Sequence, residues 1–268
     1  MKVLLTGITS FTGSHIAREF LINSYYVHAP LLRKKEDYKA LKEKRINLCR
    51  GATFYSEIDI QTFDFINLLE NVAPDIYINH GAYVTNYRSD DFDFLNHLKV
   101  NLQNIKLLIE TLKNNGCKLF IHSGSSFEPK EEYSDFGISP YGVAKKMVWD
   151  MTLFWCKKLG LDCTKVVIPN PYGLYENEDR LLPVFHTKIS NSEKVTLLEP
   201  EVIRNNIEVE ELSKCYVKVV DNWNNEKHDL IVRPKGHIES QKDFIIRSLQ
   251  EKPYYLSKEQ IMNNLLCS

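Results

Sequence analysis

The sequence lacks an apolar run long enough to cross a membrane. A spanning helix needs about 18 or more apolar residues in succession, and the apolar runs here have the length of strands. Met1-Lys2 leads directly into the short run Val3-Leu4-Leu5, which is too short for the core of a signal peptide. We therefore expect no membrane contact and no secretory leader, and we expect the protein in the cytoplasm.

The sequence also lacks an excess of charge of either sign and any metal-binding spacing of cysteines. It has 34 basic and 35 acidic residues, so no global field attracts nucleic acid or an anionic membrane. Its six cysteines show neither the C-x-x-C spacing nor a Cys/His ligand pattern. We expect reduced, scattered thiols, no metal site and no nucleic-acid partner.

What the sequence does contain is a regular alternation of short apolar runs and helical patterns over its first two thirds. Such an alternation predicts an α/β fold, in which a doubly wound parallel sheet is covered by helices on both faces. The expected strands are 2–6, 25–32, 53–58, 75–79, 118–122 and 164–168, and the expected helices are 12–23, 37–44, 62–71, 92–114 and 140–158.

The last third follows a different pattern and predicts a small additional lobe. A turn is expected at 169–171, helices at 181–190, 209–220, 241–250 and 258–266, and a strand at 229–233. We expect residues 1–169 to form the larger domain, with 207–232 returning to it, and residues 170–268 to form the lobe.

The first strand ends in a turn that is typical of phosphate-binding sites. Gly7 permits a tight turn, and Gly13 lets the following helix pack close to the sheet. The free N–H groups at the start of that helix attract a diphosphate. Ser10 stands where a middle glycine is usual, and its hydroxyl can bond a phosphate oxygen. The same strand, turn and helix also occur in proteins that bind no nucleotide.

Thr6–Gly13 resembles the T-G-x-x-G-F-x-G motif of the extended short-chain dehydrogenase/reductases, or NAD-dependent epimerase/dehydratase family, and departs from it only at Ser10. The likeness continues at 59–60, 80–82, 101, 170–173 and 204–212. It implies a Rossmann-like domain at 1–169 and a substrate-binding lobe at 170–268. The cofactor-binding residues that we expect are Gly7, Thr9, Ser10, Phe11, Thr12, Gly13, Arg33, Asp59, Ile60, His80, Gly81, Ala82, Asn101, Tyr141, Lys145 and Pro169.

The catalytic residues that the resemblance implies are Ser125, Tyr141 and Lys145. Tyr141 and Lys145 are four residues apart, so they share one face of a helix. A neighbouring ammonium favours the phenolate of a tyrosine, although such a pair on its own is common on exposed helix surfaces. Ser125 would hold the substrate oxygen, and Ser123 and Ser126 remain alternatives.

The residues after Ser125 bear on the reaction. Dehydratases of this family place an Asp-Glu pair here, whereas this chain has Ser126-Phe127, and Glu128 comes one position late. We therefore do not expect 4,6-dehydration. The loop that follows contains 129–132, is short and should form a compact rim of the active site. In the missing acidic pair and the short loop, the chain is similar to reductases of nucleotide-linked 4-keto-6-deoxysugars, such as the abequose and paratose synthases. A nucleotide-sugar 4-epimerase and a non-catalytic dinucleotide sensor remain alternatives.

The second strand bears on the choice of cofactor. No acid follows it until Glu36, while Arg33 can pair with a 2′-phosphate, assisted by Lys34 or Lys35. These basic residues favour NADP(H) as the cofactor, with NAD(H) as the alternative. The other interpretation of the same residues is a basic loop that is only solvated and binds no phosphate.

The family positions that face a nucleotide-sugar substrate are Ser125, Ser126, Asn170 and Arg204. In relatives, helices that correspond to 92–114 and 140–158 pair across a dimer interface, so we expect a homodimer. The other interpretation is that these two helices only cover the sheet and form no dimer interface.

Overall fold

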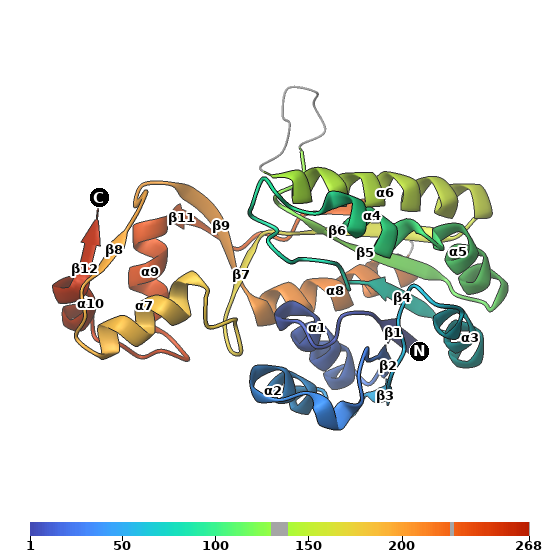
Figure 1. Cartoon of the computed structure of the whole chain (residues 1–268), viewed down its shortest axis with the longest axis horizontal. Coiled ribbons are helices and arrows are strands. Elements are labelled where there is room, and N and C mark those ends of the chain that lie inside the picture. The colour runs from blue at the N-terminus through green and yellow to red at the C-terminus, as the bar shows by residue number, and fades with distance from the viewer. Residues whose placement is uncertain (130–138, 226–227, 268) are drawn as a thin grey trace. The chain divides into compact units, whose positions relative to one another are not determined.

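The computed structural model describes residues 1–129, 139–225 and 228–267. The chain divides into two compact units (Figure 1): Met1–Ile168 with Ser213–Arg233, and Pro169–Leu212 with Pro234–Ser268. Within the described ranges, no helix is both long enough and apolar enough to cross a membrane.

The first unit is built on a seven-stranded sheet with the order β10-β6-β5-β4-β1-β2-β3, and every strand pair in it is parallel. The predicted α/β, doubly wound parallel fold is confirmed. The strand order reverses between β1 and β4, and ligands of such sheets bind beyond the carboxyl ends of the strands at this point. The strands are β1 (Lys2–Leu5), β2 (Tyr26–Pro30), β3 (Thr53–Tyr55), β4 (Ile76–Asn79), β5 (Leu119–Ser125), β6 (Asp162–Ile168) and β10 (Ile231–Val232).

Helices cover both faces of this sheet, as Figure 1 shows, with α1 and α8 on the face opposite α5 and α6. A short 3₁₀ turn, Lys35–Asp37, follows β2. The helices are α1 (Phe11–Ile22), α2 (Ala40–Leu48), α3 (Phe63–Val72), α4 (Phe94–Leu102), α5 (Ile105–Asn114), α6 (Pro140–Leu159) and α8 (Val209–Asn224).

The prediction of one long helix over 92–114 is wrong. The helix breaks at Gln103–Asn104, and two helices, α4 and α5, result. Asn104 leaves the helical conformation, with φ −119° and ψ 18°, and its side-chain amide donates to the Gln61 carbonyl at 2.8 Å. A tertiary hydrogen bond to a distant loop thus overrides a continuous helical pattern.

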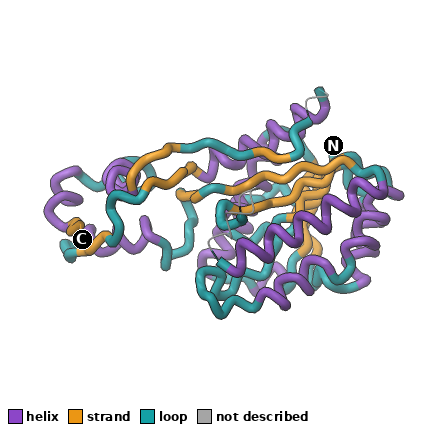
Figure 2. Tube along the Cα trace, turned by 90° about the horizontal axis from the view of Figure 1, so that it is seen from above, coloured by secondary structure: helices purple, strands orange, loops and turns teal. Residues whose placement is uncertain are grey.

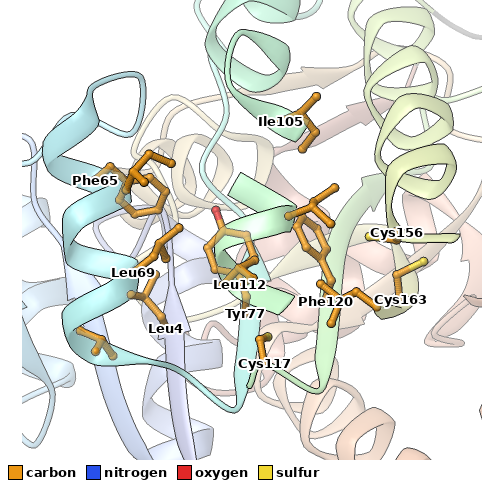
Figure 3. Packing of buried hydrophobic residues seen from close by; sticks show 14 of the residues in the cluster. Leu4, Phe65, Leu69, Tyr77, Ile105, Leu112, Cys117, Phe120, Cys156 and Cys163 are labelled. Atoms are coloured by element: carbon orange, nitrogen blue, oxygen red, sulfur yellow. The ribbon is translucent and has the colours of Figure 1, made fainter. Parts of the chain in front are cut away.

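The core of the first unit lies between the sheet and α3, α5 and α6 (Figure 3). Leu4, Tyr77 and Phe120, from three neighbouring strands, are at most 1% exposed. They pack against Phe65 of α3 and other apolar side chains. Burial of each such side chain contributes about 1.5–3 kcal/mol, and burial on both faces explains why these strands are continuous apolar runs.

The second unit contains two small sheets, β11-β9-β7 and β12-β8, as well as three helices (Figure 2). The prediction of a turn at 169–171 is wrong, because Asn170–Tyr172 forms β7, which pairs in parallel with β9. The predicted helix 258–266 ends at Asn264. The elements are β7 (Asn170–Tyr172), β8 (Val195–Leu197), β9 (Ile203–Glu208), β11 (His237–Ser240), β12 (Leu265–Cys267), α7 (Leu181–Ser190), α9 (Gln241–Gln250) and α10 (Lys258–Asn264).

Candidate active site

The turn between β1 and α1 requires both of its glycines. Gly7 has φ +77°, and a Cβ there would lie 2.8 Å from the Cα of Gly81. A Cβ on Gly13 would lie 2.3 Å from the Gly7 carbonyl oxygen. The Thr6 hydroxyl accepts from the backbone N–H groups of His80 and Gly81 at 3.0 and 2.9 Å, which ties the ends of β1 and β4 together. The turn is therefore held tightly at the point where the strand order reverses.

Ser10 is the N-cap of α1, and this explains part of its role in the glycine pattern. Its hydroxyl oxygen accepts from the Gly13 N–H at 3.0 Å, and it lies 3.2 Å from Nε2 of His80. The remaining predicted residues of the turn are Thr9, Phe11 and Thr12; the Thr9 carbonyl accepts from Arg45 at 3.4 Å. The first turn of α1 contains no acidic side chain to compete with an anionic ligand.

Tyr141 and Lys145 lie in the first two turns of α6, which Ser139 caps and Pro140 begins. A Cβ on Gly142 would lie 1.8 Å from the Phe127 carbonyl oxygen, so α6 packs directly on the loop that follows β5. Lys145 is 4% exposed, and burial lowers the pKa of its ammonium to about 8, against the opposing effect of the Glu128 charge. No hydrogen bond joins this ammonium to another described residue, so its capacity to donate is unused.

Tyr141 sits in a cage of aromatic rings. The rings of Phe92, Tyr87 and His97 lie 5.4–5.6 Å from it, all edge-on, and the Phe127 ring lies at 6.5 Å. Burial raises the pKa of the phenol, and the negative charge of Glu128 raises it further. Tyr141 is therefore a protonated phenol at neutral pH, which can donate a proton.

Ser125 ends β5. Its hydroxyl accepts from the Phe127 N–H at 3.2 Å, and among the described residues it makes no hydrogen bond with Tyr141. Ser126 is exposed, and Ser123 is buried. Of the three serines that the sequence leaves open, Ser125 and Ser126 are thus more accessible than Ser123. The loop expected to form a compact rim falls largely in 130–138, outside the described residues.

Glu128 forms a buried ion pair with Lys165 of β6, behind Ser125. The two charged groups are 2.8 Å apart, and each side chain is 4% exposed. The other carboxylate oxygen accepts from the Ser125 N–H at 2.8 Å. A carboxylate engaged in this way positions the Ser125 loop and is not available to move protons. Sequence analysis missed Lys165, although a charged residue inside an apolar strand is a signal that a buried partner exists.

A pocket opens where α4 and α5 separate, and it brings together residues from distant parts of the sequence. Ile60 and Asn101, both expected at the cofactor, line it together with Gln61, Asn79 and Asn104. Asp59 lies beside it and accepts from the Gln61 N–H at 2.9 Å. The break in the helix therefore helps to form this pocket.

The segment after β2 presents basic side chains, as expected. Arg33 and Lys34 are exposed, and Lys35 lies over the Phe54 ring. Within the described ranges, Arg33 forms no ion pair, and its backbone N–H donates to the Tyr38 hydroxyl at 3.2 Å. The Arg33 guanidinium is free to pair with an anion.

Pro169, Asn170 and Arg204 belong to the second unit. The Asn170 side chain donates to Asn206 at 2.6 Å and accepts from Arg180 at 3.0 Å. Arg204 lies on the same sheet and is exposed. Sequence analysis missed Arg180, which the structure places against Asn170. In the part of the chain that the structure describes, no cluster of His, Cys, Asp or Glu residues could hold a metal ion.

Comparison with known proteins places this geometry in a family. The model of the NAD dependent epimerase/dehydratase family matches residues 3–232. A Bacillus subtilis protein named as an uncharacterized UDP-glucose epimerase is 30% identical over 207 residues, which cover 70% of this chain and 61% of that protein. A dTDP-glucose 4,6-dehydratase of Haemophilus influenzae is 24% identical over 217 residues, or 72% of this chain and 61% of that protein. The chain thus spans about 61% of the length of these curated relatives.

Solved structures share the fold. The UDP-glucuronic acid 4-epimerase of Bacillus cereus, in complex with UDP-glucuronic acid and NAD, has a TM-score of 0.75 at 21% identity, and the match covers 100% of this chain and 87% of that one. The UDP-glucose 4-epimerase of Thermotoga maritima has a TM-score of 0.74 at 21% identity, with 99% and 89% covered.

Proposed function

The chain belongs to the NAD-dependent epimerase/dehydratase family, and from this premise we propose that it transfers a hydride between a nicotinamide dinucleotide and a carbon of a nucleotide-activated sugar. The observation that carries the proposal is the Tyr141–Lys145 pair. A protonated phenol lies one helical turn from a buried ammonium that has no hydrogen-bond partner among the described residues. A buried ammonium that makes no hydrogen bond is costly even with the Glu128 charge nearby, and a ribose hydroxyl of a bound cofactor would relieve that cost.

The residues of the first unit fit such a cofactor. The Gly7–Gly13 turn leaves backbone N–H groups at the start of α1 for a diphosphate. Ile60 and Asn101, which line the small pocket beside α4 and α5, would contact the adenosine half together with Asp59. His80, Gly81 and Ala82 would line the cofactor near the end of β4. The bound nicotinamide supplies or accepts the hydride, while the protein positions it and moves the proton.

We propose that the reaction is reduction of a 4-keto-6-deoxysugar nucleotide, with Tyr141 as the general acid. Arg33 supports this direction, because a basic residue after β2 favours NADPH, the usual donor for reductive biosynthesis, and the Tyr141 phenol can donate its proton to the oxygen of a carbonyl that is being reduced. Ser125 would hold the same oxygen, and Ser126 would lie beside it. Within the second unit, Asn170 and Arg204 are the residues that we propose for the substrate. Dehydration is not favoured, because Ser126-Phe127 replace the acidic pair and Glu128 is held by Lys165.

C4 epimerisation is the second candidate. Three of the relatives described above are named as epimerases of UDP-sugars, and the structure of one of them is a complex with NAD. Epimerisation begins with removal of a proton, so Tyr141 would first have to become a phenolate. The positive charge of an oxidised nicotinamide would favour that form.

One experiment separates these candidates. Purified protein is incubated with NADPH and a panel of nucleotide-linked 4-keto-6-deoxysugars, and the absorbance of the reduced nicotinamide is followed. A reductase oxidises NADPH with at least one member, and Tyr141→Phe lowers that rate by about 100-fold or more. An epimerase consumes no NADPH but interconverts a nucleotide hexose with its C4 epimer. A protein that binds the dinucleotide and does neither is a sensor, and the catalytic proposal is then wrong.

We also propose a homodimer, because α6 presents an exposed apolar stripe. Val143, Met147, Met151 and Phe154 recur at helical spacing and are 39–52% exposed. Helix α4, which packs beside α6 (Figure 1), adds Leu95 at 66% exposure. A second copy of the same two helices would bury this surface.

A further inference from the structure

A group of charged side chains surrounds Arg204 in the second unit, and the proposed function uses only Arg204 itself. Arg204 on β9 and Glu239 on β11 stand directly opposite each other in an antiparallel pair. Residues so placed have Cβ atoms about 4.5–5.5 Å apart, so a guanidinium and a carboxylate there are within reach of an ion pair. Among the described residues they form none, and Glu239 pairs with another arginine.

Arg247 of α9 is the residue that holds the Glu239 carboxylate. Its Nη2 and Nε atoms donate to the two carboxylate oxygens at 2.5 and 3.2 Å, a bidentate geometry that fixes both groups. Its Nη1 atom donates to the Tyr172 hydroxyl and to Glu251, each at 3.1 Å. The Arg247 and Glu239 side chains are only 23% and 16% exposed. Arg247 therefore keeps the Glu239 charge turned away from Arg204.

Gln241, the first residue of α9, holds one edge of the Arg204 guanidinium. Because a guanidinium only donates, the Gln241 amide places its oxygen toward Arg204, where it accepts from Nε at 2.9 Å and from Nη2 at 3.3 Å. Gln241 is buried, whereas Arg204 is exposed. The other edge of the guanidinium, which Nη1 and Nη2 form, has no partner among the described residues. Such an edge matches two oxygens of a phosphate.

We infer that Arg247 and Gln241 are positioning residues for the diphosphate of the nucleotide-sugar substrate, and that both act through Arg204. Gln241 orients the Arg204 guanidinium, and Arg247 leaves its charge uncompensated by withdrawing Glu239 from it. The diphosphate is the anionic group that every nucleoside-diphosphate sugar carries, so it is the part of the substrate that such a guanidinium attracts. This inference rests on the proposed function, in which Arg204 contacts the substrate.

The test measures the affinity for UDP, dTDP and CDP by titration calorimetry in wild type and in charge variants. Arg247→Met keeps an unbranched apolar stem but frees Glu239 to pair with Arg204. We expect the affinity to fall about tenfold or more, the size of one lost charge-assisted contact. Adding Glu239→Gln to Arg247→Met should restore the affinity to within about threefold of wild type, because the competing carboxylate is then gone.

The matched control combines Arg247→Met with Glu251→Gln. It has the same net charge as the other double variant but leaves Glu239 in place, so its affinity should stay as low as that of Arg247→Met. In an Arg204→Met background, Arg247→Met should cause no further loss. Equal recovery in the two double variants, or a further loss in the Arg204→Met background, means that Arg247 does not act through Glu239 and Arg204, and this inference is then wrong.

A second variant keeps the test valid if Arg247→Met does not fold. Gln241→Glu supplies a carboxylate against Arg204 without a change of shape, and we expect it to lower the affinity about tenfold. If wild type binds none of the three nucleotides, the proposed function fails. If wild type binds and Gln241→Glu binds equally well, the charge of Arg204 is not what the site presents, and this inference alone is wrong.

Discussion

Replacing Lys165 by methionine should destabilise the first unit strongly, because the change leaves Glu128 as a buried charge without its counterion. The ion pair is 2.8 Å long, and both side chains are 4% exposed. Methionine keeps most of the volume of the lysine stem, so the loss is that of the ammonium: its ion pair with Glu128 and its position over the Trp149 ring, 5.3 Å from the ring centroid. Glu128 would keep the hydrogen bond from the Ser125 N–H and its longer-range attraction to the Lys145 ammonium, but no ion pair among the described residues.

The expected magnitude follows from the cost of an unpaired buried charge. Removing one partner of a buried ion pair costs about 3–5 kcal/mol. In a unit of this size, 1 kcal/mol corresponds to roughly 2–4 °C in the melting midpoint. We therefore expect Lys165→Met to lower the midpoint by roughly 6–20 °C at pH 7. Glu128→Gln together with Lys165→Met removes the charge and should recover part of that loss.

The assay is thermal unfolding followed by circular dichroism. The matched control is Lys106→Met, the same substitution in the exposed pair Lys106–Glu110, which is 3.4 Å long. Exposed pairs contribute about 0–1 kcal/mol, so this control should melt within roughly 2–4 °C of wild type. If Lys165→Met melts as the control does, or if the double variant is less stable than Lys165→Met, the reasoning about the buried pair is refuted.

Three further predictions concern pH, cofactor and assembly. Burial lowers the pKa values of His80 and His97 to about 3 and 4 and that of His122 well below its usual range. Below about pH 6.5 the unfolded chain therefore binds protons that the folded chain does not. Each of these histidines should lower the free energy of unfolding by about 1.4 kcal/mol for every pH unit below that value. A melting midpoint that is equal at pH 7 and pH 5 would contradict this. Arg33→Ala should weaken NADPH binding by about tenfold and NADH binding little, because one charge-assisted pair is lost; equal affinities for both cofactors, unchanged by the substitution, would refute the NADP(H) preference. Met151→Glu should convert the proposed dimer to a monomer in light scattering, and a wild type that is already monomeric at micromolar concentration would refute the interface.

The local features of the site could be predicted from the sequence, because their partners are near in the chain. The turn from Gly7 to Gly13 depends on residues six positions apart, and Tyr141 and Lys145 share one helix face. The order of strands and helices was also predictable, since apolar runs buried on both faces are distinctive.

Features that depend on distant partners were not predictable. Glu128 and Lys165 are 37 positions apart, and Tyr172 and Arg247 are 75 positions apart, so no local pattern joins them. The break at Asn104 depends on a hydrogen bond to Gln61, 43 positions away. The strands of the second unit are short and give a weak pattern. Residues 170–172 have the composition of a turn, and only their pairing with β9 identifies these residues as a strand.

The most direct test of the central claim follows the hydride itself. The purified protein is given NADPH deuterated at C4 of the nicotinamide and the nucleotide-linked 4-keto-6-deoxysugar that it consumes, or the whole panel if none has been identified. Mass spectrometry then measures deuterium in the sugar. Reduction with Tyr141 as proton donor predicts one deuterium on the sugar carbon for each cofactor oxidised, and about 100-fold slower labelling in Tyr141→Phe. Cofactor binding with no deuterium in any sugar, or labelling at the wild-type rate in Tyr141→Phe, would contradict it.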